Sequence, residues 1–148
     1  MATAGRGRMG VGELLWSAQR LYERGWDEAL SRVGVTRAEV AVLFRLGQSP
    51  GLSGSELARR THLSVPGVAA MLARMGERGW VRRKEHPSHR RLLEVFLTPA
   101  GKRRLLRARQ ALRAVDARAL KGMKSPQRAA LQRALAHVVE LLGPSEST

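Results

Sequence analysis

The sequence predicts a mostly helical α+β chain with about six helices and one two-stranded β-hairpin. Three observations support this prediction. Apolar residues recur at helical spacing near both ends, capped helix starts cluster in the middle, and two basic strand-like runs follow them. A length of 148 residues suits a single domain with a substantial core.

Two helices are expected in the first third of the chain. The first spans residues 11–33 and is amphipathic, and Gly34 is expected to end it. Thr36 and Glu39 form a capping box, in which each side chain binds a backbone N–H at the helix start, so a second helix should begin there. Residues 48–52 contain proline and glycine and predict a loop.

A pair of helices follows this loop. Ser53 and Glu56 form another capping box, and residues 61–63 are expected to turn the chain. Ser64 is a suitable N-cap for a helix that Gly79 would end. The inward stripe of that helix consists of Val68, Met71, Leu72 and Met75. Two helices joined by a tight turn, the second presented outward, predict a helix-turn-helix that fits the major groove of DNA.

Two basic strand-like runs come directly after the helix-turn-helix. Residues 80–84 and 92–97 are expected to pair as a hairpin with its turn near Pro87. Arg90 and Arg91 would then lie at the tip. A hairpin with a cationic tip beside a helix-turn-helix is a winged helix, and such a tip can place arginine in the minor groove, where the negative potential is strong.

Two longer helices are expected after the hairpin. Thr98 and Pro99 supply the cap and first residue of a helix that runs to about Leu120, and residues 125–142 form the last helix. The terminal helices carry more apolar surface than a compact winged helix needs for itself. We therefore expect them to pair with a second copy of the chain. The alternative is that these apolar stripes only close a monomer.

The charge balance indicates a polyanionic partner. The formal net charge is +15, and the sequence pI is near 11.8. Nucleic acid is the first candidate, and an anionic membrane surface is the second. The segment from Arg82 to Arg109 contains ten lysines and arginines but only two acidic residues, and it coincides with the predicted hairpin and the helix after it. The competing interpretation is a merely solvated basic face.

Several other classes are not expected. Cysteine is absent, so the chain has no disulfide. No apolar run approaches the roughly 20 residues of a membrane span. Residues 1–10 lack a following apolar signal core, so we expect a disordered basic arm and a cytoplasmic protein.

Neither of the two aspartates, Asp27 and Asp116, lies beside a histidine in sequence, and no phosphate loop is present, so neither an enzyme nor a cofactor is expected. His86 and His89 do not predict a metal site, because a hairpin tip does not preorganise tetrahedral ligands.

Five short segments in the middle of the chain form a recognisable pattern: Glu56–Ala58, Leu63–Ser64, Gly79–Arg83, His89–Arg91 and Leu97–Gly101. With them, the chain from about Val35 to Gly101 resembles the multiple-antibiotic-resistance regulator (MarR) family of bacterial transcription factors. The resemblance implies a homodimer that binds a pseudo-palindromic operator with half-sites about 10 bp apart. It also implies that a small aromatic anion bound between the dimer helices and the winged unit releases the DNA.

Two departures from the family pattern affect the expected DNA contacts. His89 stands where the family usually has an aspartate that the resemblance implies shapes the wing, whereas Arg91 retains the position implied to enter the minor groove. Ala69 and Ala70 replace polar residues of the second helix of the helix-turn-helix. We therefore expect few direct contacts to base edges and a large share of affinity from the phosphate backbone and DNA shape.

Eleven residues are candidates for contacting DNA. They are Ser64, Val65, Pro66, Gly67, Ala69, Ala70, Arg74, Arg83, His89, Arg90 and Arg91. Ser64 is first a helix cap, and Arg83 could equally cover the strand. A protonated His89 would add a phosphate contact as the pH falls.

Three residues are candidates for an effector pocket. Trp16 and Arg20 are four residues apart on the first helix, and Phe44 could face them across the bundle. We nevertheless favour core packing for Trp16 and Phe44, and also for Trp26 and Trp80.

The sequence therefore predicts one domain, residues 11–148, with a winged unit at about 36–98 and dimerisation helices at about 11–33 and 99–142. Its expected function is that of a homodimeric DNA-binding transcriptional regulator, a repressor released by a small ligand. One alternative is a weakly specific or architectural DNA-binding protein without ligand control. The other is a winged-helix module that binds protein.

Overall fold

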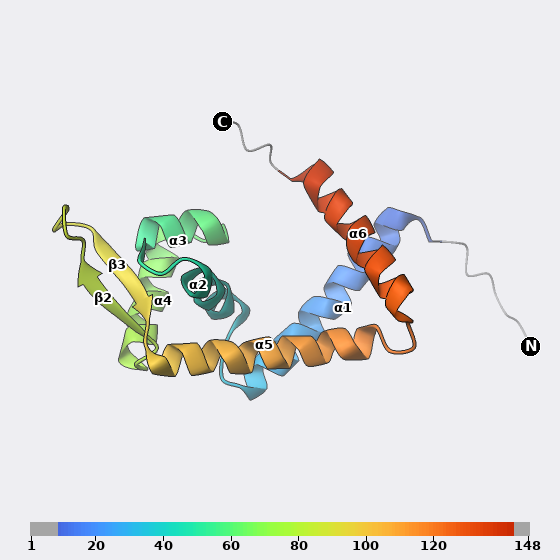
Figure 1. Cartoon of the computed structure of the whole chain (residues 1–148), viewed down its shortest axis with the longest axis horizontal. Helices are drawn as coiled ribbons and strands as arrows, with labels where there is room; N and C mark the ends of the chain where they lie inside the picture. Colours follow the sequence, from blue (N-terminus) through green and yellow to red (C-terminus); the bar gives the residue numbers. More distant parts are fainter. Residues whose placement is uncertain (1–8, 144–148) are drawn as a thin grey trace, which may run out of the picture. The chain divides into compact units, whose positions relative to one another are not determined.

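The computed structural model describes residues 9–143, and the expected arm at residues 1–10 lies almost entirely outside them. This part of the chain contains six α-helices and three β-strands (Figure 1). They are α1 (Val11–Arg32), α2 (Arg37–Gln48), β1 (Leu52–Ser53), α3 (Gly54–Thr61), α4 (Val65–Glu77), β2 (Val81–Glu85), β3 (Leu93–Leu97), α5 (Pro99–Ala119) and α6 (Ser125–Leu142). The predicted mostly helical class is confirmed.

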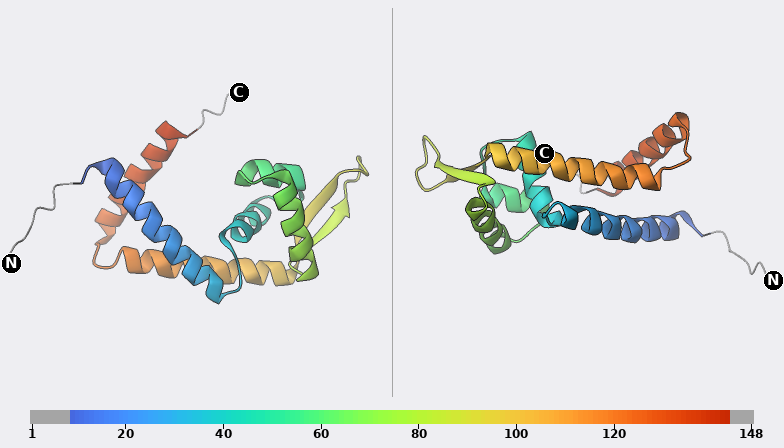
Figure 2. Two further views of the ribbon diagram at one scale, coloured as in Figure 1. Left: turned by 180° about the vertical axis from the view of Figure 1, so that it is seen from behind. Right: turned by 90° about the horizontal axis from the view of Figure 1, so that it is seen from below.

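The chain divides into two compact units, residues 1–115 and 116–148. The first contains α1 to α4, the strands and most of α5, and the second contains the end of α5 and α6. Within the first unit, α2, α3 and α4 gather beside the hairpin of β2 and β3, which extends beyond them (Figure 2). No helix among the described residues is long and apolar enough to cross a membrane.

The helix-turn-helix forms where the caps predict it. The Ser53 backbone N–H donates to Glu56 Oε2 at 2.8 Å, and the Glu56 N–H donates to Ser53 Oγ at 3.2 Å, so α3 begins with a complete capping box. His62 adopts the left-handed conformation at φ 56° and ends α3. The Gly67 N–H then donates to Ser64 Oγ at 3.1 Å and caps α4. The inward stripe of α4 is buried as expected.

The sheet has three strands rather than the two that the sequence predicted. β1 pairs with β3 through the partners Leu52 and Val95, and the strand order is β1-β3-β2. The Gly51 N–H also donates to the Val95 carbonyl at 2.9 Å. Part of the predicted loop 48–52 is therefore a strand. A two-residue strand has no alternation of its own, so only its pairing with β3 identifies it.

The base of the hairpin is fastened to α5. The Thr98 N–H donates to the Trp80 carbonyl at 3.0 Å, and the Thr98 hydroxyl donates to the Gly79 carbonyl. The Gly101 N–H donates to Thr98 Oγ1 at 3.0 Å and starts α5. A Cβ atom on Gly101 would lie 2.0 Å from the Trp80 carbonyl oxygen, so only glycine allows this approach.

The core lies in the first unit, between the three-helix group, β3 and the first half of α5. Its largest fully buried residues are Leu30, Val42, Leu43, Leu46, Leu57, Val68, Met75 and Val95. Trp80 is buried as expected, and Trp26 and Phe44 are half-buried against this core. The expectation that Trp16 packs in the core is wrong, because its side chain is 62% exposed. Helical spacing indicates that a face is apolar but not what covers it.

The last helix spans the expected residues 125–142 and lacks buried residues. Its N-cap residue is Lys124, and the Lys124 N–H donates to Gln127 Oε1 at 2.8 Å. α5 ends at Ala119, close to the predicted Leu120. No residue of α6 within the described range is buried.

Candidate nucleic-acid interface

The outward face of α4 is small and apolar. Val65, Pro66, Ala69, Ala70 and Arg74 are exposed, and only the last has a long polar side chain. Thymine methyl groups can contact such a face, but few hydrogen bonds to base edges are possible. The structure thus brings the predicted α4 residues together on one surface.

Ser64 and Gly67 first stabilise the start of α4. The Ser64 hydroxyl oxygen accepts the Gly67 N–H, and a Cβ on Gly67 would lie 2.7 Å from that oxygen. Both residues are exposed, and the Ser64 hydroxyl proton stays free to donate outward. Ser64 can therefore cap the helix and contact a phosphate at the same time.

The hairpin presents its arginines on two faces. Arg83 is paired with Val95 in the register, so it shares the face of the core residue but lies exposed beyond it. Arg82 is paired with Phe96 on the other face, and its Cζ lies 4.8 Å from the centre of that ring. The two neighbouring cations are therefore directed to opposite sides of the wing.

The wing tip carries the last three predicted residues. His89, Arg90 and Arg91 are exposed in the turn between β2 and β3. Three backbone hydrogen bonds close this turn, from the His86 N–H to the Leu92 carbonyl at 2.9 Å, from the Leu92 N–H to the His89 carbonyl at 2.8 Å and from the His89 N–H to the His86 carbonyl at 3.3 Å. The arginines thus project from an ordered turn rather than from an open loop.

The predicted contact arginines are electrostatically uncompensated. Among residues 9–143, no ion pair within 4.0 Å involves Arg74, Arg83, Arg90 or Arg91. By contrast, Arg78 pairs with the buried carboxylate of Glu39 at 3.2 Å. Unpaired cations on an outward helix and hairpin tip attract a polyanion.

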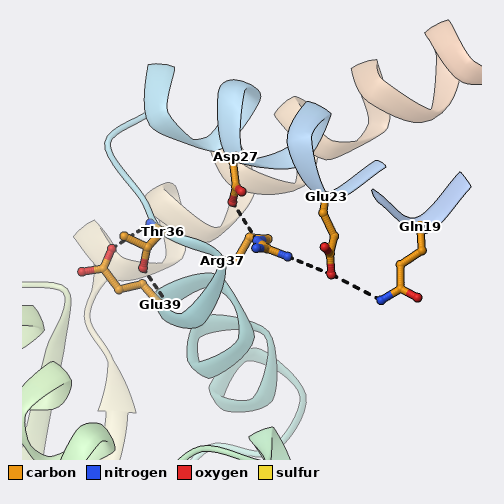
Figure 3. Close-up of polar contacts among 6 residues, drawn as sticks. All are labelled: Gln19, Glu23, Asp27, Thr36, Arg37 and Glu39. Carbon is orange, nitrogen blue, oxygen red and sulfur yellow. Dashed lines mark hydrogen bonds and ion pairs between the residues drawn. The ribbon is translucent and has the colours of Figure 1, made fainter. Parts of the chain in front are cut away.

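Acidic side chains instead join α1 to α2, as Figure 3 shows. The Arg37 guanidinium lies 2.7 Å from Asp27 Oδ1 and 3.2 Å from Glu23 Oε1. The Gln19 amide donates to Glu23 at 3.4 Å, which extends the contacts along α1. Sequence reasoning missed Arg37, because partners ten and fourteen positions away across a turn leave no periodic signal.

The candidate effector residues are not brought together in one chain. Arg20 lies over the Trp16 ring at 5.1 Å on α1. Phe44 instead has the guanidinium of Arg109 at 5.2 Å, and it lines a separate hollow of about 280 Å³ beside Trp26. Trp16 belongs to a different shallow hollow near the start of α1.

A larger hollow that the sequence did not indicate lies between the end of α2, the wing and α5. Its volume is about 490 Å³. Its lining residues are Leu46, Gly47, Pro50, Arg82, Phe96, Leu97, Lys102, Leu105, Leu106 and Arg109. Three cations and no carboxylate line it, and Phe96 offers an aromatic surface, so it suits a flat organic anion.

Comparison with known proteins agrees with this geometry. A profile of the MarR family matches residues 33–92. The HTH-type transcriptional repressor Rv2887 of Mycobacterium tuberculosis is 35% identical over 133 residues, which cover 90% of this chain and 93% of that protein. A structure of the transcriptional repressor CouR bound to a 23-mer DNA duplex has a TM-score of 0.78 and 27% identity, covering 93% of this chain and 99% of that one.

Structures of Rv2887 are also similar to this chain. Its complex with DNA has a TM-score of 0.76 and 31% identity, with 88% of this chain and 98% of the other covered. Its complex with salicylic acid has a TM-score of 0.71 and 32% identity, with 89% and 98% covered.

Proposed function

Because the chain belongs to the MarR family of DNA-binding winged helix-turn-helix transcriptional repressors, which are not enzymes, we propose that it works as a homodimer whose grip on an operator is released by a small aromatic acid. The observation that supports the DNA surface best is the group of unpaired arginines on α4 and the wing. Phosphate neutralisation supplies most of the affinity, and Arg90 and Arg91 enter the minor groove.

Selection of bound duplexes from a random DNA pool tests operator recognition. We expect a pseudo-palindrome with half-sites about 10 bp apart. Competition with random DNA then measures specificity, and a dedicated repressor should prefer its site by more than roughly 10³-fold. Failure to enrich any sequence would contradict the proposal that the chain recognises an operator.

Exposed apolar faces support the homodimer. Leu14, Trp16 and Leu21 of α1 are more than half exposed. On α6, Val139 and Leu142 are 70% and 82% exposed. Apolar surface of this extent on terminal helices is best covered by a second copy related by a twofold axis. Light scattering after size exclusion should give the dimer mass at micromolar protein, and a monomer would contradict the proposal.

The hollow between α2, the wing and α5 is the proposed effector site. Rv2887 forms complexes with salicylic and p-aminosalicylic acid, and three cations around an apolar floor suit the same class of ligand here. Arg82 and Phe96 belong to the wing strands, so a ligand there would bear directly on the wing. Binding to the folded state should raise the melting temperature.

Salicylate and benzoate are suitable probes for this site, with benzyl alcohol as the uncharged comparison. The two acids should raise the melting temperature of the native chain, and benzyl alcohol should not. Arg109→Gln should reduce the rise, whereas the exposed Arg103→Gln, which lies outside the hollow, should not. An equal rise in both variants would contradict this location.

A second candidate function has one specific observation in its favour. The alanine-lined face of α4 offers few hydrogen bonds to bases, which suits a weakly specific or architectural DNA-binding protein. A specificity ratio below roughly 10³ would favour that function over operator control.

A further inference from the structure

His86 holds the turn from which the wing arginines project. Its Nδ1 atom accepts a hydrogen bond from the Ser88 backbone N–H at 3.1 Å. A side-chain acceptor that binds the N–H two residues later is the arrangement of an Asx turn, in which aspartate or asparagine usually serves. Because Nδ1 accepts, neutral His86 carries its proton on Nε2.

The other ring nitrogen of His86 faces β3. Nε2 lies 3.7 Å from Glu94 Oε1, and the two side chains are 30% and 22% exposed. The His89 ring packs against the His86 ring with centroids 5.4 Å apart. Lys84 is opposite Glu94 in the β2–β3 register. The His86 ring therefore has one carboxylate and one imidazole beside it.

The backbone transmits the position of His86 to the tip. The His89 N–H donates to the His86 carbonyl at 3.3 Å, and the Leu92 N–H donates to the His89 carbonyl at 2.8 Å. These bonds form two consecutive turns, and Arg90 and Arg91 occupy the second one. A change in the first turn therefore moves the arginines.

We propose that His86 is the positioning residue of the wing, and that its hydrogen bond from the Ser88 N–H sets Arg90 and Arg91 for DNA. The wing-shaping role thus passes from position 89, where the resemblance places an aspartate, to His86. This inference rests on the proposed contact between the wing and DNA.

Two substitutions test this hydrogen bond. His86→Asn supplies an oxygen that can accept the Ser88 N–H. His86→Leu removes the acceptor. At about pH 8 we expect the asparagine variant to bind the selected duplex like the native chain, and the leucine variant to bind roughly 3- to 10-fold more weakly, the effect of one hydrogen bond.

The comparison of the two variants gives the decisive readout. Affinity for the selected duplex is measured by fluorescence anisotropy at about pH 8 and fixed ionic strength. Equal weakening in His86→Asn and His86→Leu, or no weakening in His86→Leu, would overturn the proposal, because the Ser88 hydrogen bond would then not set the tip.

Nuclear magnetic resonance tests the turn without DNA. The ¹⁵N shifts of His86 in the free protein should show an unprotonated Nδ1 and a protonated Nε2 at about pH 8. The opposite tautomer would overturn the role of His86 even if the chain binds DNA. If the predicted tautomer is present but the native chain shows no salt-dependent duplex binding, the proposed function fails instead. In that case His86 shapes a tip with another use, and its assignment as a DNA-positioning residue falls too.

Discussion

The guanidinium of Arg104 lies over the indole ring of Trp80, with Cζ 4.8 Å from the ring centre. The same guanidinium donates to the carbonyl of Val33 at the end of α1. A second arginine, Arg78, covers the Trp80 ring at 5.0 Å and pairs with Glu39. One buried tryptophan at the base of the wing is therefore connected through arginines to α1, α2 and α5.

Arg104→Lys should destabilise the fold by about 1–2 kcal/mol, because an ammonium group cannot both stack on the indole and reach the Val33 carbonyl in the guanidinium geometry. Chemical denaturation at fixed protein concentration measures the difference. Arg103→Lys is the matched control, since Arg103 is exposed at the preceding position of α5. Equal losses in the two variants would show that the Arg104 contacts contribute nothing.

Gly101→Ala, which adds one methyl group, should strongly lower the stability of the fold. The added Cβ would meet the Trp80 carbonyl oxygen at 2.0 Å, and backbone on both sides of the contact must move. Overpacking of this kind costs about 1–3 kcal/mol or more. Gly76→Ala, at a helical position where a Cβ meets nothing within 4 Å, should be neutral or stabilising. Thermal melting distinguishes the two, and equal melting temperatures would contradict the close approach.

The capping box of α3 predicts a pH dependence of stability. Hydrogen bonds from the Ser53 backbone and side chain lower the pKa of Glu56 below its ordinary value of 4.5, and Arg60 and Arg59 add to the effect. A lowered folded-state pKa gives stability that is fully present above about pH 4.5 and is lost as the pH falls through the folded-state pKa. Glu56→Gln should therefore lose less stability than the native chain on acidification, as followed by urea unfolding. Parallel losses would contradict this assignment.

The Arg37 pairs should contribute little to stability despite their short distances. Arg37, Glu23 and Asp27 are each more than a third exposed, so solvent screens them. A double-mutant cycle with Arg37→Met and Asp27→Asn should give a coupling energy of about 0.2–1 kcal/mol. A coupling above about 2 kcal/mol would show that these charges hold α1 on the winged unit more firmly than surface pairs do.

The sequence predicted the features that depend on local chemistry. The two predicted capping boxes, at Thr36 and Ser53, are present, as is the buried stripe of α4. The DNA-contact candidates on α4 and the wing lie exposed on their elements, although their contacts with DNA stay predictions.

Features that depend on distant partners could not be predicted. Strand β1 exists only because Leu52 meets Val95 more than forty residues later. The exposure of Trp16 depends on which neighbour covers α1, and helical spacing cannot supply that information. The turn role of His86 could not be predicted, because the sequence signature of an Asx turn is aspartate or asparagine, not histidine.

The salt dependence of duplex affinity tests the central claim most directly. If α4 and the wing bind DNA, the logarithm of the native chain's association constant should fall steeply with the logarithm of the salt concentration. Arg90→Gln or Arg91→Gln should make this slope shallower by about 1 per lost phosphate contact. Arg24→Gln, on the exposed face of α1 where Arg24 pairs with Glu28, should leave the slope unchanged. A shallow native slope, or wing variants that behave like Arg24→Gln, would contradict the account.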